Sequence, residues 1–328
     1  MLCRRWRAGA LAVISQAPAG MSPLWSIVLA AGRGRRLASV TGSVPKQFWA
    51  PSGARSLLEE TIHRIAPLGD PAHLVTVVDR SHRQYVERIG ASNVGTCVYQ
   101  PGDRGTANGV LLALSIVASQ DPGAMVFVTP SDHGVARPEW FRTGVRRAVA
   151  HVEARSDDVV LIGVEASSPS TDYGWILQSP GGDDLGRVSF FVEKPARPLA
   201  TRLMAAGALW NTMVLVARVS TLLDLHRRHI PAATAAFEAA PFAGLNTCQD
   251  VIDRLYLALP PADLSHDVLA RARDLRCLAI GPQAGWTDLG TPDRLSAWLG
   301  ANCEVGENLE LSASVRDRAR SDAGPVRA

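Results

Sequence analysis

The chain has 328 residues, of which 47% are hydrophobic and 20% charged, a composition typical of a globular protein with a large core. Its net charge is only +3 and its arginines are scattered rather than gathered in runs, which argues against nucleic acid as a partner. No apolar stretch approaches the ~20 residues that a membrane span requires, so we expect no membrane partner. The cysteines are 5 in number and include no C-x-x-C pair, which favours a reducing, cytoplasmic location.

From Trp25 onward, short apolar runs alternate with amphipathic segments. This alternation predicts an α/β fold with a mainly parallel, Rossmann-like sheet and helices on both faces. The expected strands are residues 25–31, 74–79, 95–99, 124–129 and 159–165, and the expected helices are 55–66, 81–89, 106–119 and 138–154.

After residue 165 the pattern changes to longer strand-like segments that contain Gly, Tyr and Trp. We expect strands over 173–178, 187–193, 208–217 and 275–280, with helices over 218–258, 265–273 and 292–299. This half indicates a smaller, mixed or antiparallel lobe. Residues 22–300 are therefore expected to form one unit with two lobes, 22–165 and 166–300.

The two ends differ from this unit. Residues 1–21 faintly resemble a signal peptide, but their apolar stretch is short and broken by Ser and Gln, so we expect an upstream extension or a disordered leader. Residues 301–328 are polar and expected to be mostly disordered.

Lysine is scarce in this chain. Of 34 basic side chains only Lys46 and Lys194 are lysines. Because an ammonium is compact whereas a guanidinium is a planar fork, a crowded phosphate site can require Lys and exclude Arg. The alternative is that the two lysines remain by chance on a solvated surface. Both, however, lie in motifs that indicate anion sites.

The first motif runs from Leu29 to Leu37, LAAGRGRRL, directly after a buried strand. Glycines at the carboxyl end of a parallel strand let backbone N–H groups close around phosphates. The spacing is neither that of a dinucleotide fold nor that of a P-loop, and a plain tight turn stays open as an alternative. Lys46, in VPKQF, lies ten residues past Arg36 and within reach of the same loop.

Together, L-A-A-G-x-G-x-R-L and P-K-Q-F are similar to the signature of the sugar-1-phosphate nucleotidyltransferases, and P-K-Q-F resembles their mannose-1-phosphate guanylyltransferase branch. The resemblance implies a glycosyltransferase-A-like fold with a nucleotide lobe and a sugar lobe. It implies catalytic roles for Arg36 and Lys46, and nucleotide contacts from Leu29, Ala30, Ala31, Gly32 and Gly34. The family usually has Thr where this chain has Arg35, which puts one phosphate contact in question.

A second segment, from Gln100 to Gly109, joins a strand to the start of a helix. Such a junction offers unpaired N–H groups that can bind the edge of a base. It resembles the R-x-T-A segment with which the guanylyltransferase branch holds guanine, which implies base contacts from Gln100, Arg104, Thr106 and Ala107. The alternative is a simple helix cap with Thr106 as the N-cap residue.

Two aspartates stand in contexts that indicate a cation site. Asp132 ends the AMVFVTPSD strand segment, and Asp288 lies in GWTDLGT. Mg²⁺ commonly takes one or two carboxylates and completes its shell with phosphate and water. Both segments resemble the family's metal-binding motifs, which implies Mg²⁺ as cofactor. Ordinary turn aspartates are the alternative.

Three segments of the second lobe combine aromatic, carboxylate and amide groups that suit a sugar. They resemble the family's Y-G-Y-I, F-x-E-K-P and W-N-S-G segments, which implies a sugar-phosphate pocket built from Tyr173, Gly174, Glu193, Lys194 and Asn211. Lys194 would also be catalytic, because it would hold the attacking phosphate.

The resemblance runs from about residue 25 to 300 and implies an enzyme that joins GTP and mannose 1-phosphate to give GDP-mannose and pyrophosphate, with in-line attack on the α-phosphorus. Alternatives are the same chemistry on another hexose or heptose 1-phosphate, or a weakly catalytic nucleotide-sugar-sensing homologue. The glycine spacing of the first motif does not match that of a Rossmann oxidoreductase. Whether the chain forms a homodimer is left open.

Overall fold

The computed structural model describes residues 23–302, apart from residue 52 and residues 181–184. The predicted leader and residues 303–328 of the predicted tail lie outside the described residues, as does the side chain of Arg35. Within the described part, no helix has the length and apolar character to cross a membrane.

The centre of the protein is a single nine-stranded sheet with the order β3-β2-β1-β4-β9-β6-β10-β8-β7. The first four strands in this order are parallel, and so are β6 and β10. β9 runs antiparallel to β4 and β6, and β8 and β7 complete an antiparallel edge. The strands are β1 Leu24–Ala30, β2 Leu74–Asp79, β3 Thr96–Gln100, β4 Met125–Pro130, β6 Val159–Glu165, β7 Gly174–Gln178, β8 Leu185–Glu193, β9 Leu209–Arg218 and β10 Leu275–Ile280.

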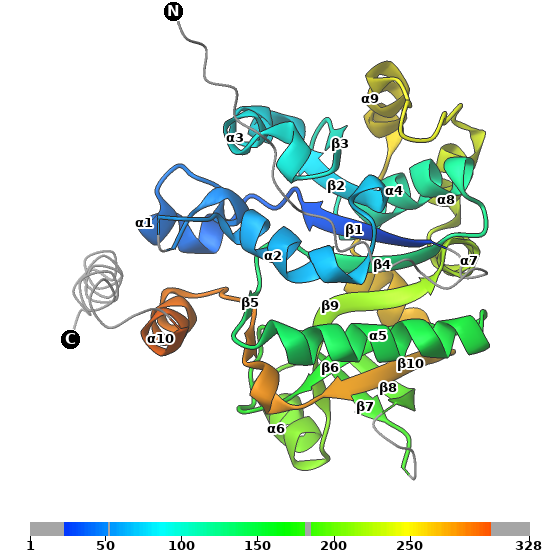
Figure 1. Cartoon of the computed structure of the whole chain (residues 1–328). Helices are drawn as coiled ribbons and strands as arrows, with labels where there is room; N and C mark the ends of the chain where they lie inside the picture. Colours follow the sequence, from blue (N-terminus) through cyan, green and yellow to red (C-terminus); the bar gives the residue numbers. More distant parts are fainter. Residues whose placement is uncertain (1–22, 52, 181–184, 303–328) are drawn as a thin grey trace, which may run out of the picture.

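Helices cover both faces of this sheet (Figure 1). Side chains alternate along each strand, so β1 sends Ile27 to one apolar cluster and Val28 to the other. The Ile27 cluster includes α4 Thr106–Gln120, α7 Val219–His229, α8 Pro231–Ala239 and α9 Gln249–Ala258. The Val28 cluster includes α2 Leu57–Ile65, α3 Arg83–Ile89, α5 Pro138–Ala154 and α6 Arg197–Ala205. The fold class predicted from the sequence is confirmed.

β9 joins the parallel part of the sheet to the antiparallel part. Its second half pairs with β4, whereas Leu209 and Trp210 in its first half pair with β7. Its register with β6 shifts between Ile162 and Gly163. The sheet is continuous across the predicted lobe boundary near residue 165, and the division into two lobes stays a prediction.

Several predicted elements differ in detail from the structure. The expected helical stretch 218–258 is three helices, because Pro231 starts a new helix and residues 240–248 are not helical. The short helix expected over 265–273 is a π-helix at Leu264–Val268 followed by a 3₁₀ turn. The sequence interpretation missed α6, the short α1 Ala38–Thr41, and a two-stranded sheet of β5 Gly134–Val135 and β11 Trp286–Thr287. The last helix, α10 Pro292–Asn302, packs through Leu295 and Leu299 in a third apolar cluster that includes Val40 of α1.

Candidate active site

The glycine loop after β1 folds directly against Lys46. Gly34 has a φ of +62°, and a Cβ atom there would lie 2.7 Å from the backbone nitrogen of Lys46. The neighbouring Gln47 donates from Nε2 to the carbonyl oxygens of Ala30 (2.8 Å) and Gly32 (2.9 Å). The PKQF segment therefore fixes the shape of the loop, as the closeness of the two motifs predicted.

The ammonium of Lys46 connects the two predicted metal-binding aspartates. Its Nζ lies 3.0 Å from Oδ2 of Asp132 and donates to the backbone oxygen of Asp288. Lys46 is only 6% exposed, so it lies in the crowded setting that its retention suggested. Burial alone would raise the pKa of Asp132, but Lys46 and His133 together outweigh it and hold that pKa below its usual value.

The small sheet of β5 and β11 brings the two aspartates together although they are far apart in sequence. Val135 pairs with Trp286 and Gly134 with Thr287, so Asp132 precedes one strand and Asp288 follows the other. Among the residues that the structure describes, no group of three or more His, Cys, Asp or Glu side chains is arranged to hold a metal. Two carboxylates fit a hard cation such as Mg²⁺ only if phosphate and water complete its shell.

The Asp288 carboxylate is held by three donors. Its Oδ1 accepts from the Tyr173 hydroxyl (2.9 Å), the Gly290 amide (3.0 Å) and Nη1 of Arg294 (2.8 Å). Burial would raise the pKa of Asp288, but Arg294, His133 and the Gly290 amide together outweigh it and lower that pKa. Burial and the adjacent Asp288 raise the pKa of Tyr173, which keeps its phenol protonated as a donor.

The sequence interpretation missed Arg294. Its guanidinium pairs with both Asp288 and Asp172, and its Cζ lies 4.7 Å from the centroid of the Tyr173 ring. Its position six residues after Asp288, in the first turns of α10, was the only signal.

Three of the predicted sugar-binding residues meet on one face of β7, β8 and β9. Gly174 pairs with Glu193 in the ladder, and a Cβ at Gly174 would lie 2.5 Å from Oε2 of Glu193 and 3.2 Å from Cβ of Asn211. Tyr173 points the other way, because side chains alternate along a strand, and its ring packs 4.6 Å from that of Trp210. Only the backbone of Tyr173 borders this group.

Lys194 lies beside Glu193 but is not crowded. Its Nζ is 3.2 Å from Oε1 of Glu193, and its side chain is 59% exposed. The crowding inferred from the scarcity of lysine therefore applies to Lys46 and not to Lys194. Its exposed ammonium is free to turn toward a ligand phosphate.

The π-helix segment links the two predicted substrate regions. Oγ1 of Thr106 donates to Asp263 (3.0 Å) and accepts from the amide of Leu264 (2.8 Å). Nδ2 of Asn211 lies 3.5 Å from Oγ of Ser265. Burial raises the pKa of Glu193, and Lys194 and, to a smaller extent, the Ser265 hydroxyl partly offset this. Asp263 and Ser265 were missed because a π-helix has no common sequence signature.

The predicted base-binding segment is tightly held by the protein itself. Gly105, not Thr106, is the N-cap residue of α4. The amide of Ala107 donates to the oxygen of Ala262 (3.0 Å), and Nε of Arg104 donates to that of Tyr256 (3.3 Å). Gln100 is buried, with Oε1 3.5 Å from the Tyr256 hydroxyl. The Ala107 amide is thus not a free donor for a base.

The remaining predicted residues lie in or beside the glycine loop. Arg36 is exposed and makes no ion pair with any residue that the structure describes. The backbone oxygen of Leu29 accepts from the Ser131 amide (3.1 Å), which ties the end of β1 to the end of β4. The partly exposed Ala31 and exposed Gly32 follow, and a Cβ at Gly32 would meet no atom within 4 Å.

Backbone strain is concentrated at the candidate site. Across the described ranges, the non-glycine residues with positive φ are Lys194 (46°), Met213 (59°) and Leu289 (48°). Each is a candidate site residue or lies within two positions of one, Asn211 or Asp288. Because such conformations cost of order 1–3 kcal/mol each, they persist where the surroundings impose them, commonly at ligand sites.

Comparisons with known proteins identify the family of this chain. The family model described as "Nucleotidyl transferase" matches residues 25–302. The mannose-1-phosphate guanylyltransferase ManC of Salmonella typhimurium is 30% identical over 82% of this chain and 58% of its own length. The alginate biosynthesis protein AlgA of Pseudomonas syringae is 29% identical over 80% of this chain and 56% of its own. The chain thus spans little more than half the length of these relatives.

Solved structures give the same picture. A crystal structure entitled mannose-1-phosphate geranyltransferase, from Thermus thermophilus, superposes with a TM-score of 0.74, at 28% identity, over 84% of this chain and 79% of that one. A putative glucose-1-phosphate thymidylyltransferase from Bacillus anthracis superposes with a TM-score of 0.57 at 15% identity, over 86% of this chain and 96% of that one, which indicates a shared fold.

Proposed function

Because the chain belongs to the nucleotidyl transferase family, we propose that it joins GTP and mannose 1-phosphate to give GDP-mannose and pyrophosphate. A phosphate oxygen of mannose 1-phosphate attacks the α-phosphorus of GTP. A P–O bond forms there, and the bond to the bridging oxygen of the β-phosphate breaks, so that pyrophosphate leaves with the electron pair. No covalent intermediate with the protein is needed.

One observation supports this proposal most strongly: a buried ammonium lies at the junction of the glycine loop and the two aspartates. The backbone of Lys46 packs against Gly34, and its ammonium contacts Asp132 and the backbone oxygen of Asp288. A ligand triphosphate on the loop would meet this ammonium, and its charge would stabilise the departing pyrophosphate. Both reacting groups are anions, so the main tasks of the protein are alignment and neutralisation of charge.

The two carboxylates would hold Mg²⁺, with the phosphates of both substrates completing its shell. When bound, Mg²⁺ would neutralise charge on the reacting phosphates. The hydrogen bonds from Tyr173 and Arg294 fix the Asp288 carboxylate, so its orientation is set before any ligand binds.

On the sugar side, Glu193 and Asn211 would pair with hydroxyls, and the absence of a side chain at Gly174 lets the Glu193 carboxylate lie close against the strand. Lys194 would bind the sugar's phosphate and steer its oxygen toward the α-phosphorus. The segment from Asp263 to Ser265 connects this group to Thr106, so sugar and nucleotide are placed relative to one another by one short element. Strict use of GTP, a cytoplasmic location and a homodimer stay predictions.

A substrate matrix tests the proposal. The purified chain is mixed with each of four nucleoside triphosphates and with mannose, glucose and heptose 1-phosphates, with and without Mg²⁺, and pyrophosphate release is measured. We expect the highest kcat/KM with GTP and mannose 1-phosphate, and no pyrophosphate release without Mg²⁺. A higher value for another sugar would replace mannose in the proposal, and no release with any pair would favour a sensing homologue.

A further inference from the structure

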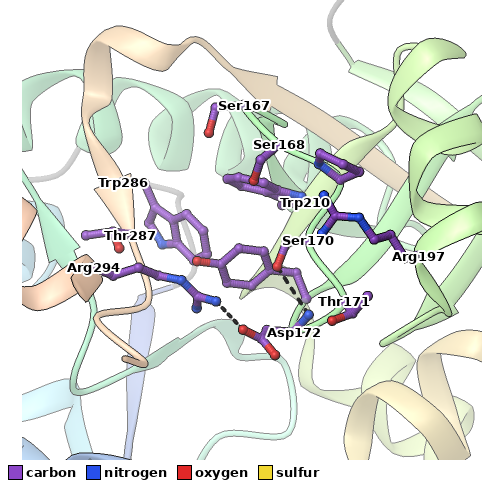
Figure 2. A pocket seen from close by; sticks show the side chains of 12 residues that line it. Ser167, Ser168, Ser170, Thr171, Asp172, Arg197, Trp210, Trp286, Thr287 and Arg294 are labelled. Carbon is purple, nitrogen blue, oxygen red and sulfur yellow. Dashed lines mark hydrogen bonds and ion pairs between the residues drawn. The ribbon is translucent and has the colours of Figure 1, made fainter. Parts of the chain in front are cut away.

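A cavity of about 450 Å³ has Thr287 and Arg294 in its lining, next to the candidate active site (Figure 2). Residues 167–173 form one wall, and Arg197, Trp210, Trp286 and Arg294 contribute to the rest. Its volume lies in the range of small-molecule sites. None of the residues predicted to bind the sugar lines it except Tyr173.

The cavity and the predicted sugar site are on opposite faces of the sheet. Tyr173 and Trp210 line the cavity, and their rings pack together at 4.6 Å. Gly174 and Asn211, the next residues along β7 and β9, face the other way and meet Glu193. Because successive side chains of a strand point to opposite faces, a ligand in the cavity would not occupy the predicted sugar site.

The two guanidiniums of the cavity differ in their partners. Arg294 is paired with Asp172 and Asp288, whereas Arg197 is exposed and makes no ion pair with a described residue. Figure 2 shows the two arginines on opposite sides of the cavity. Arg197 also begins α6, whose N-cap residue Ala196 offers no side-chain acceptor, so the helix dipole favours an anion there. The cavity thus has one end suited to a phosphate.

The rest of the lining suits a polyhydroxylated ring. Trp210 and Trp286 contribute aromatic ring surface, against which the apolar face of a sugar ring can pack. Ser167, Ser168 and Thr171 add hydroxyl groups to the lining.

We propose that this cavity is a second binding site that takes a monosaccharide phosphate, with the phosphate on Arg197 and the sugar ring against Trp210 and Trp286. It is separate from the catalytic sugar site and does not depend on the proposed reaction. Arg294 forms the far end, where its partner Asp172 can accept hydrogen bonds from sugar hydroxyls.

Isothermal titration calorimetry tests this site on the full chain without nucleotide or metal. The probes are glucose 6-phosphate, glucose and inorganic phosphate, and the background is Lys194→Gln, which weakens the predicted catalytic site. Arg197→Ala is compared with Arg202→Ala, since Arg202 is also exposed on α6 but does not line the cavity. Arg294 is left unchanged because it also holds Asp288.

We expect one glucose 6-phosphate bound per chain. Its affinity should be at least about tenfold weaker in Arg197→Ala, because a hydrogen-bonded charge is lost. Its affinity in Arg202→Ala should be unchanged. Glucose and inorganic phosphate should each bind more weakly. Equal affinity in the two arginine variants, no binding at all, or phosphate binding as tightly as the sugar phosphate would overturn the assignment. None of these outcomes depends on GTP turnover, so failure here is distinct from failure of the proposed function.

Discussion

The contact between the glycine loop and Lys46 can be tested with one methyl group. In Gly34→Ala, the added Cβ would lie 2.7 Å from the backbone nitrogen and 2.9 Å from the Cβ of Lys46. Both are atoms of a segment that Gln47 ties to the loop, so neither can simply rotate away. The residue would also keep a φ of +62°, which L side chains rarely adopt.

Two costs add in this variant. The left-handed backbone costs about 1–2 kcal/mol, and overpacking of a tight contact costs about 1–3 kcal/mol. We therefore expect the free energy of unfolding to fall by roughly 2–5 kcal/mol, the sum of these two ranges. Activity should fall further than stability explains, because the collision displaces the Lys46 ammonium from Asp132 and Asp288.

Two matched variants separate the two costs. Gly32→Ala lies in the same loop, where the new Cβ meets nothing within 4 Å and the φ is not positive. Gly207→Ala keeps a positive φ of +75° with open space around it. In urea denaturation we expect almost no loss for Gly32→Ala, a loss of about 1–2 kcal/mol for Gly207→Ala and the largest loss for Gly34→Ala. If Gly34→Ala were no less stable than Gly207→Ala, the proposed packing of the loop on Lys46 would be refuted.

Three further predictions follow from other contacts. Lys46→Arg should lower kcat about 100-fold, since a misplacement of about 1 Å costs that much. The exposed Lys194 should tolerate Arg with a smaller loss of kcat. Steady-state kinetics on both variants tests this, and near-normal turnover of Lys46→Arg would contradict the inference that its site is too crowded for a guanidinium. Gly174→Ala should raise the KM for the sugar phosphate more than that for the nucleotide, because its Cβ would push Glu193 aside; equal effects on both KM values would place the sugar elsewhere. Burial lowers the pKa of His226 from 6.5 to about 4, so the unfolded chain binds a proton that the folded chain does not, and stability falls as pH drops from about 6.5 toward 4. Between pH 7.5 and pH 5 the protonation of His226 should lower the free energy of unfolding by about 2 kcal/mol. In urea denaturation, His226→Gln should therefore lose less stability over that interval than the wild type. Equal losses in the two proteins would refute the lowered pKa of His226.

Much of the fold could be predicted from local pattern. The helix expected over 138–154 has those bounds in the structure, because Pro138 pre-sets its first turn and the apolar spacing is regular. The strand over 74–79 likewise matches, as a fully buried and mostly apolar run. The β5–β11 sheet could not be predicted, since each strand has two residues and its pairing joins segments far apart in sequence.

The candidate site divides in the same way. Lys46, Asp132 and Asp288 were identified from their local contexts, and the structure brings them into contact. Arg294 and Ser265 were missed because their roles come only from tertiary contacts with Asp288 and Asn211. Tertiary structure also reverses a local expectation at Ala107, whose amide at the start of α4 pairs with Ala262 instead of remaining free.

In the proposed reaction, a phosphate oxygen of the sugar phosphate attacks the α-phosphorus of the nucleotide. Mass spectrometry of the products from GTP and mannose 1-phosphate labelled with ¹⁸O in its phosphate tests this step directly. We expect GDP-mannose that retains the whole label and pyrophosphate that contains none. Label in the pyrophosphate, or the absence of a sugar nucleotide, would contradict it.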